Sequence, residues 1–93
     1  MLIFDRRGRE LRNAIEHATV SIRSLPEVGF DRAAEVTDEA AARLMVAARR
    51  LADRGRADDA RRMLADARPD GCGQVDQLIS SVLDQTVMSI RKG

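Results

Sequence analysis

The side chains best suited to catalysis are those of a single histidine, His17, and a single cysteine, Cys72, which lies between Gly71 and Gly73. A cysteine acts as a nucleophile when an imidazole accepts its proton and a third group orients that base. The spacing of His17 and Cys72 does nothing to bring them together, and a zinc site would need further histidines or cysteines. The sequence therefore predicts a non-enzymatic protein with no catalytic residues, no metal site and no cofactor.

Arginine is the other chemically distinctive residue, because it accounts for 15 of the 16 basic residues. Its planar guanidinium binds carboxylates and phosphates through paired hydrogen bonds. A formal net charge of +1 and the absence of tryptophan and tyrosine disfavour nucleic acid as the partner. An acidic protein and an ordinary solvated surface are the other interpretations. The arginines gather in an N-terminal group (Arg6, Arg7, Arg9, Arg12) and a central group (Arg43, Arg49, Arg50, Arg54, Arg56, Arg61, Arg62).

Helices must position these side chains, since apolar residues recur at intervals of three and four. The first predicted helix covers residues 5–24, and His17 falls roughly opposite its apolar stripe. Pro26 ends this helix because the residue before a proline is pushed out of the helical region. Residues 1–4 read as a short extended arm, and residues 26–36 as a connection with at most one helical turn. The stripe consists of Leu11, Ile15, Ala18, Ile22 and Leu25.

Two further helices are predicted over residues 38–54 and 57–67. Thr37 is the expected N-cap of the first, and Gly55 marks the turn between them. So short a turn requires an antiparallel helical hairpin. The spacing is similar to that of a tetratricopeptide hairpin, without its bulky aromatics and without a second copy, so we transfer only the geometry. The residues that carry the similarity are Leu44, Ala47, Ala48, Leu51, Gly55, Ala60, Leu64 and Ala67.

The last predicted helix covers residues 74–91 and is apolar over well over 120° of its circumference, wider than one neighbouring helix requires. This helix must therefore be central in the bundle or shared with another chain. Because aromatic residues make up only 2% of the chain, the core must be built from aliphatic side chains and alanine. Phe30, in the predicted connection, is expected to close one end of that core or to anchor a partner.

The length of 93 residues is typical of one domain, residues 1–93. A single cysteine forms no internal disulfide, which suits a reducing compartment, and no apolar run approaches the ~18 residues of a membrane span. We therefore expect a cytoplasmic protein of the all-α class. Its predicted architecture is a small bundle of about four helices containing an antiparallel helical hairpin, with dimerisation as one way to complete it.

The apolar helical surface predicted here exceeds what so small a chain needs, which favours association with a second copy or with another protein. We expect a regulator or adaptor that binds a protein partner and that also associates with itself as a homodimer. The alternative is a nucleic-acid-associated regulator that uses the arginine clusters. The predicted partner-binding residues are Leu11, Ile15, Ile22, Leu78, Val82, Val87 and Ile90 for apolar contact, with Arg49, Arg50 and Arg54 for orientation against acidic groups.

Overall fold

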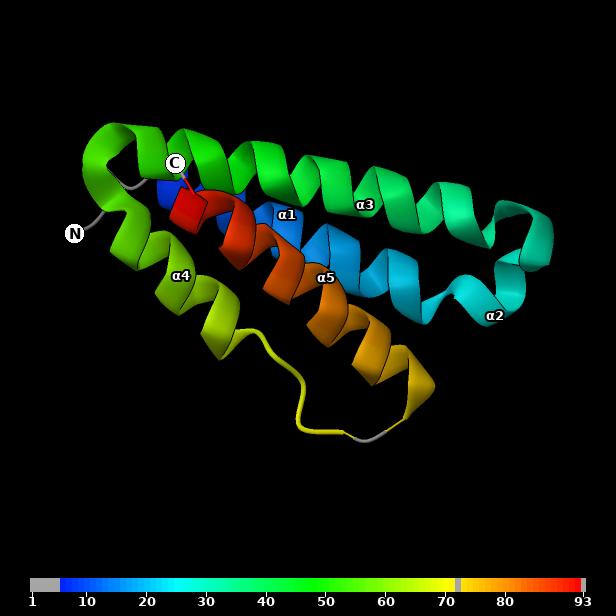
Figure 1. Ribbon diagram of the computed structural model, residues 1–93. Helices are drawn as coiled ribbons and strands as arrows, with labels where there is room; N and C mark the ends of the chain where they lie inside the picture. Colours follow the sequence, from blue (N-terminus) through cyan, green and yellow to red (C-terminus); the bar gives the residue numbers. More distant parts are fainter. Residues whose placement is uncertain (1–5, 72, 93) are drawn as a thin grey trace.

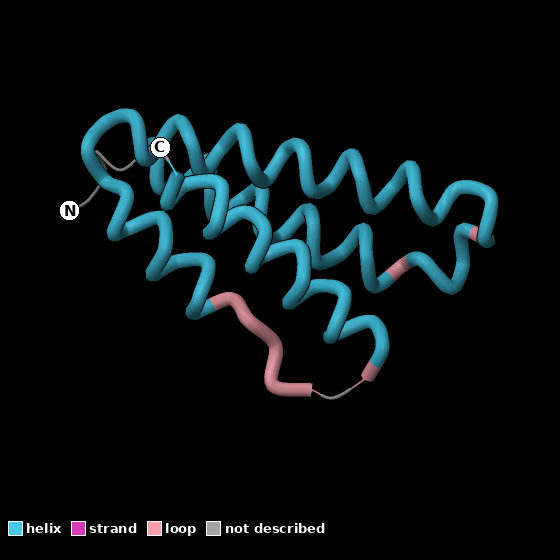
Figure 2. Tube along the Cα trace, viewed as in Figure 1, coloured by secondary structure: helices cyan, strands magenta, loops and turns pink. Residues whose placement is uncertain are grey.

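The computed structural model describes residues 6–71 and 73–92, and this part of the chain is helical with short connections and no strand (Figure 2). The prediction of an all-α bundle is therefore confirmed. The elements are α1 (Arg6–Arg23), α2 (Leu25–Val28), α3 (Phe30–Leu51), η1 (Ala52–Arg56), α4 (Ala57–Asp66) and α5 (Gln74–Lys92) (Figure 1).

Helices α1 and α3 form the closest pair in the molecule, running antiparallel along its long axis (Figure 1). The predicted connection over residues 26–36 is wrong, because the single turn of α2 and the first two turns of α3 occupy most of it. Only Gly29 interrupts the helical backbone there. Pro26 is tolerated because it stands in the first turn of α2, where a missing N–H breaks no helical hydrogen bond.

Thr37 lies inside α3 and does not cap a helix, which corrects a second prediction. Its Oγ1 donates a hydrogen bond of 2.9 Å to the carbonyl oxygen of Ala33, one turn earlier. A threonine followed by Asp38 and Glu39 resembles a helix start. The preceding residues include strong helix formers such as Ala33, Ala34 and Glu35, however, and the helix extends back to Phe30.

The predicted hairpin of residues 38–54 and 57–67 is confirmed at its turn and in its second helix. Helix α3 ends at Leu51, and η1 reverses the chain so that α4 folds back from it (Figure 1). The reversal depends on Gly55, whose φ of 82° and ψ of 15° lie in the left-handed region that side chains disfavour.

The two glycines with positive φ carry a testable difference in stability. Gly55 is in the left-handed helical region, whereas Gly29 has φ 95° and ψ 160°, which is almost exclusive to glycine. An added Cβ would meet no atom at either position, so only backbone strain opposes alanine. We expect Gly29→Ala to lower the free energy of unfolding by about 2 to 3 kcal/mol and Gly55→Ala by about 1 kcal/mol, measured by urea denaturation. Equal losses would contradict this assignment.

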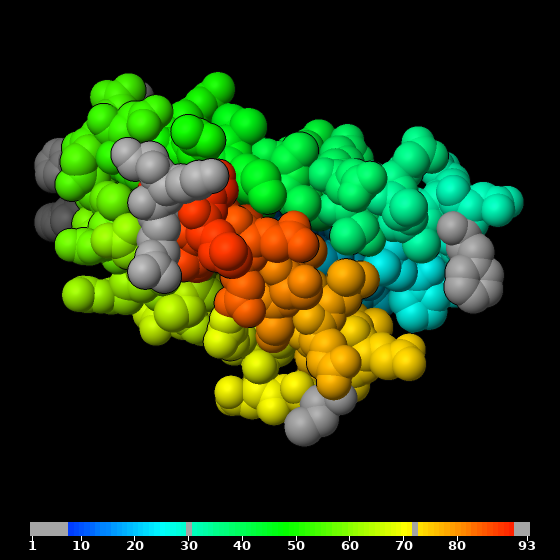
Figure 3. All heavy atoms as spheres, viewed as in Figure 1, coloured from blue at the N-terminus to red at the C-terminus, as the bar shows by residue number. Residues whose placement is uncertain are grey.

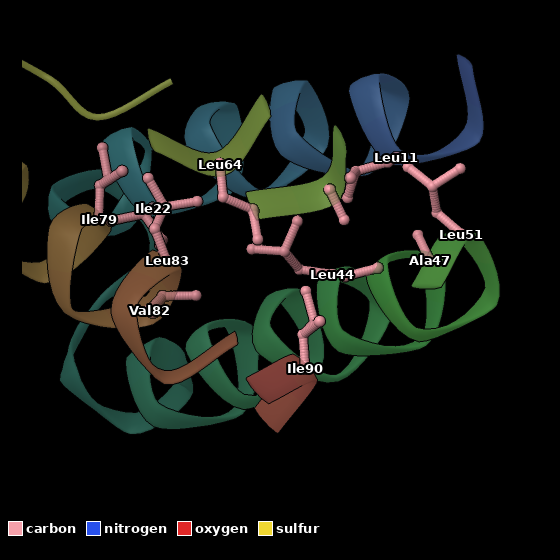
Figure 4. Close-up of a cluster of buried hydrophobic side chains, with 12 residues drawn as sticks. Leu11, Ile22, Leu44, Ala47, Leu51, Leu64, Ile79, Val82, Leu83 and Ile90 are labelled. Atoms are coloured by element: carbon pink, nitrogen blue, oxygen red, sulfur yellow. The ribbon is translucent and has the colours of Figure 1, made fainter. Parts of the chain in front are cut away.

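Helix α5 packs against all three of the other long helices, α1, α3 and α4. Its wide apolar face is thus used by three neighbours within one chain. Thr86 is fully buried in this face, and its Oγ1 donates a 2.9 Å hydrogen bond to the carbonyl oxygen of Val82, so no polar atom is left unpaired there. Figure 4 shows the core, in which the labelled side chains are Leu11, Ile22, Leu44, Ala47, Leu51, Leu64, Ile79, Val82, Leu83 and Ile90.

Candidate protein-binding surface

The apolar residues predicted to bind a partner lie mainly inside the bundle. Leu11 and Ile22 are 0% exposed, and Val82 and Ile90 are 4% and 5% exposed. The three remaining residues are half-buried and pack against the same core: Ile15, Leu78 and Val87. These side chains hold the four long helices together, so they do not form an exposed apolar surface in this structure.

Three large apolar side chains are exposed among the residues the structure describes: Val20 (65%), Val46 (50%) and Met88 (67%). They belong to α1, α3 and α5 respectively. Single exposed apolar residues are normal on protein surfaces. Val46 differs from the other two because it lines a groove.

This groove, which we call the α1–α3 groove, has a volume of about 520 Å³ and lies between the two antiparallel helices. Alanines form much of its lining, so the two helix backbones are covered there by little side-chain volume. Polar groups from both helices border the alanines. The lining residues are Glu10, Asn13, Ala14 and His17 from α1, with Ala42, Arg43, Val46 and Ala47 from α3.

Polar contacts across the groove fix the register of its two walls. Arg50 donates a hydrogen bond of 2.8 Å from Nη1 to Oε2 of Glu10. About two helical turns further along, Nη1 of Arg43 lies 3.4 Å from Nε2 of His17. Arg43 also lies 3.8 Å from the carboxylate of Glu39 on its own helix. His17 is exposed, as its position opposite the apolar stripe predicts.

Two of the three predicted arginines, Arg50 and Arg54, stand at one end of this groove, whereas Arg49 lines neither this groove nor the hollow beside it. Arg50, Arg54, Asp53 and Glu10 line an adjoining hollow of about 430 Å³. Arg49 and Arg54 are exposed and have no ion-pair partner within the described residues. Glu10 lines both hollows, so the arginines and the alanine-lined groove form one continuous surface.

Charge is segregated along the molecule, whose long axis measures 39 Å. The start of α1, the end of α3, η1, the start of α4 and the end of α5 gather at one end (Figure 1). These segments, residues 6–14, 45–62 and 86–92, hold twelve basic and four acidic residues. The other described segments, residues 15–44, 63–71 and 73–85, hold four basic and ten acidic residues. We call these the basic end and the acidic end.

Arginines of the basic end are partly neutralised by neighbours on their own helix. Nε of Arg56 donates a hydrogen bond of 2.9 Å to Oδ2 of Asp59, and Arg61 pairs with Asp58. Both pairs are partly or largely exposed, so each contributes little to stability. The basic end thus keeps an excess of positive charge that the net value of +1 conceals.

Some of the other chemically suggestive residues fall outside the part of the chain that the structure describes. Cys72 and the predicted arm over residues 1–4 lie outside the described residues, as does the side chain of Phe30. Within the described part of the chain, no three histidine, cysteine or carboxylate side chains gather where they could hold a metal ion. The helices described here include none with the length and apolar character needed to cross a bilayer.

Sequence reasoning missed the groove because its lining depends on the α1–α3 pairing. Asn13, His17 and Val20 recur at helical spacing on α1, as do Glu39, Arg43, Val46 and Arg50 on α3. Those two exposed stripes could have indicated the groove. Because residues 26–36 were predicted to be a connection, however, α3 was predicted to be shorter than it is. Comparison with known proteins adds no assignment, because the chain matches no protein-family model, no curated protein and no solved structure.

Proposed function

We propose that this protein is a non-enzymatic interaction module, acting as a regulator or adaptor, that binds an acidic amphipathic helix of a protein partner along the α1–α3 groove. The observation that carries the proposal is the position of Val46. This residue is half exposed in an alanine-lined groove that continues into the basic end.

The shape of the groove favours a helix as the occupant. Antiparallel helices leave a shallow channel between them, and small residues let a third backbone approach closely. Ala14 of α1 with Ala42 and Ala47 of α3 supplies that small surface. Val46 supplies an apolar contact for a leucine or isoleucine of the incoming helix. On such a helix the apolar contact residues recur at the i, i+3, i+4 spacing.

The charge at the end of the groove favours carboxylates on the partner. Arg49 and Arg54 are exposed without ion pairs inside the described structure, so binding need not break an existing pair. Arginine presents two parallel N–H donors to a carboxylate. Complementary charge raises the association rate and fixes the orientation of the bound helix.

Nucleic acid is the second candidate partner. The excess of positive charge at the basic end favours it, whereas the net charge of +1 does not. Phosphate binding needs cations alone, however, whereas the α1–α3 groove adds an apolar strip beside them. Carboxylates also interrupt the arginines, since Glu10, Asp53, Asp58 and Asp59 all belong to the basic end. A protein helix uses both the apolar strip and the cations, so we favour it.

Fluorescence anisotropy with two labelled peptides of about 20 residues tests the proposal. One peptide has leucines on one helical face and glutamates on the other, and its control has the same composition in scrambled order. We expect the amphipathic peptide to bind at least about tenfold more tightly than the scrambled one. Val46→Asp should remove most of that difference, a loss of about 1.4 kcal/mol or more.

Met88→Asp is the matched control, because Met88 is also an exposed apolar residue but lies on α5 outside the groove. It should bind the amphipathic peptide as the natural chain does. Equal affinity for both peptides would reject groove recognition. Tighter binding of a DNA duplex, unchanged by Val46→Asp and steeply weakened by salt, would establish the nucleic-acid alternative instead.

A further inference from the structure

A third hollow, of about 350 Å³, lies at the acidic end of the molecule. The start of α5 meets α2 and the start of α3 there, and side chains of α5 lie beside those of α2 on the surface (Figure 3). Its apolar lining includes Leu25, Val75 and Leu78, which are half-buried at the edge of the core. Ala33 of α3 also lines it. We call it the α2–α5 groove.

Carboxylates outnumber arginines around the α2–α5 groove, although the exposed Arg32 lies next to the groove-lining Ala33. Glu27 and Asp31 are exposed on α2 and on the first turn of α3, within two residues of groove-lining positions. Asp76, in the first turn of α5, is paired at 3.2 Å with Arg23. A ligand that fits this site is therefore apolar where it enters the groove and basic where it leaves it.

The chain contains a segment with this pattern. Residues 2–4 are leucine, isoleucine and phenylalanine, and arginine follows at positions 6, 7 and 9. This segment directly precedes α1, whose first residue, Arg6, stands at the basic end of the molecule.

The segment cannot reach the α2–α5 groove of its own chain. Helix α1 has 18 residues, so its two ends are separated by about 27 Å. Five fully extended residues span at most about 18 Å. The segment also starts at the far end of α1 from the groove. The α2–α5 groove is accessible to it only on a second copy.

We infer that residues 2–4 of one copy occupy the α2–α5 groove of another, so that the basic end of each molecule meets the acidic end of the next. Such an interface is heterologous and joins copies head to tail. The contact area is small, so association is weak, is favoured at high protein concentration and weakens with salt. This inference uses none of the residues of the α1–α3 groove and stands apart from the proposed function.

Sedimentation equilibrium between about 10 µM and about 1 mM protein tests the inference, because weak contacts populate only at such concentrations. The natural chain should exceed its monomer mass of 10.3 kDa as concentration rises, by about twofold or more. Phe4→Asp removes the apolar ligand, and Ala33→Arg fills the groove and adds a repelling charge. Each variant alone should remain a monomer.

Mixing the two variants is the decisive step. The Phe4→Asp chain keeps an intact groove and the Ala33→Arg chain keeps an intact segment, so an equimolar mixture should form a dimer of twice the monomer mass and nothing larger. Ala34→Arg is the matched control, since Ala34 is exposed and does not line the groove. It should associate as the natural chain does, and circular dichroism should show the same helix content for all variants.

Three results would overturn the inference. The first is a natural chain that stays monomeric over the whole concentration range. The second is a mixture that fails to dimerise although the natural chain associates. The third is an Ala34→Arg variant that abolishes association as fully as Ala33→Arg. Phe4→Asp and Ala33→Arg change different parts of the proposed contact, so either variant keeps the test decisive where the other perturbs folding.

Discussion

Replacing Leu44 with alanine is expected to lower the free energy of unfolding by about 3 kcal/mol. Leu44 is 0% exposed on α3. Leu64 of α4 and Ile90 of α5 point toward it in the core (Figure 4). Truncation therefore leaves a cavity where three helices meet, and the surrounding backbones cannot close it without separating from one another.

Urea denaturation followed by circular dichroism measures this loss. A domain of this size has a total stability of about 5 to 15 kcal/mol, so the variant should remain folded with a much lower midpoint. Leu78→Ala is the matched control, because Leu78 is only half-buried at the edge of the core. It should lose about half as much. Equal losses at the two positions would contradict the central place of Leu44.

Reversing the charge of Arg54 is expected to weaken binding of the acidic amphipathic peptide by about tenfold at low salt. Exposed charge pairs contribute up to about 1 kcal/mol each, and Arg54→Glu replaces an attraction with a repulsion of similar size. Arg54 is exposed and has no ion pair with any described residue, so the change should leave folding intact. The expected effect shrinks as salt shortens the Debye length.

Arg32→Glu is the control for this second prediction. Arg32 is also exposed, but it belongs to the acidic end, far from the α1–α3 groove. Both variants change the net charge by the same amount, so any difference between them reports position. Equal weakening by the two would show that the peptide responds to overall charge and would reject the basic end as its binding surface.

Local sequence signals located most helices but misjudged their connection. Helix α1, the turn at Gly55, α4 and α5 were predictable, because apolar spacing and glycine act within a few residues. The missing first turns of α3 show the limit of such signals. Phe30 to Val36 contains no repeated apolar stripe strong enough to predict a helix, and contacts of α3 with its neighbouring helices add to the helix propensity there.

The candidate site shows the same limit. Arg49, Arg50 and Arg54 were identified from sequence, and Arg50 and Arg54 line a hollow at one end of the groove. Val46 and the alanines of the groove were not identified, because each is an ordinary helical residue until α1 is placed beside α3. The apolar residues predicted to bind a partner were selected because they recur at helical spacing. That spacing is the same for residues of a core and residues of an interface, so it could not distinguish the two.

The sequence by itself determined the class of this protein: helical periodicity and glycines act locally and specify an all-α chain. Only the tertiary structure decided what its surfaces are. Hydrophobic burial is satisfied by any neighbour, within the chain or outside it, so periodicity could not tell whether α5 is central or shared. The distribution of charge is also decided by the fold. Folding separates twelve basic residues from ten acidic ones along a 39 Å axis, although the net charge of the chain is close to zero.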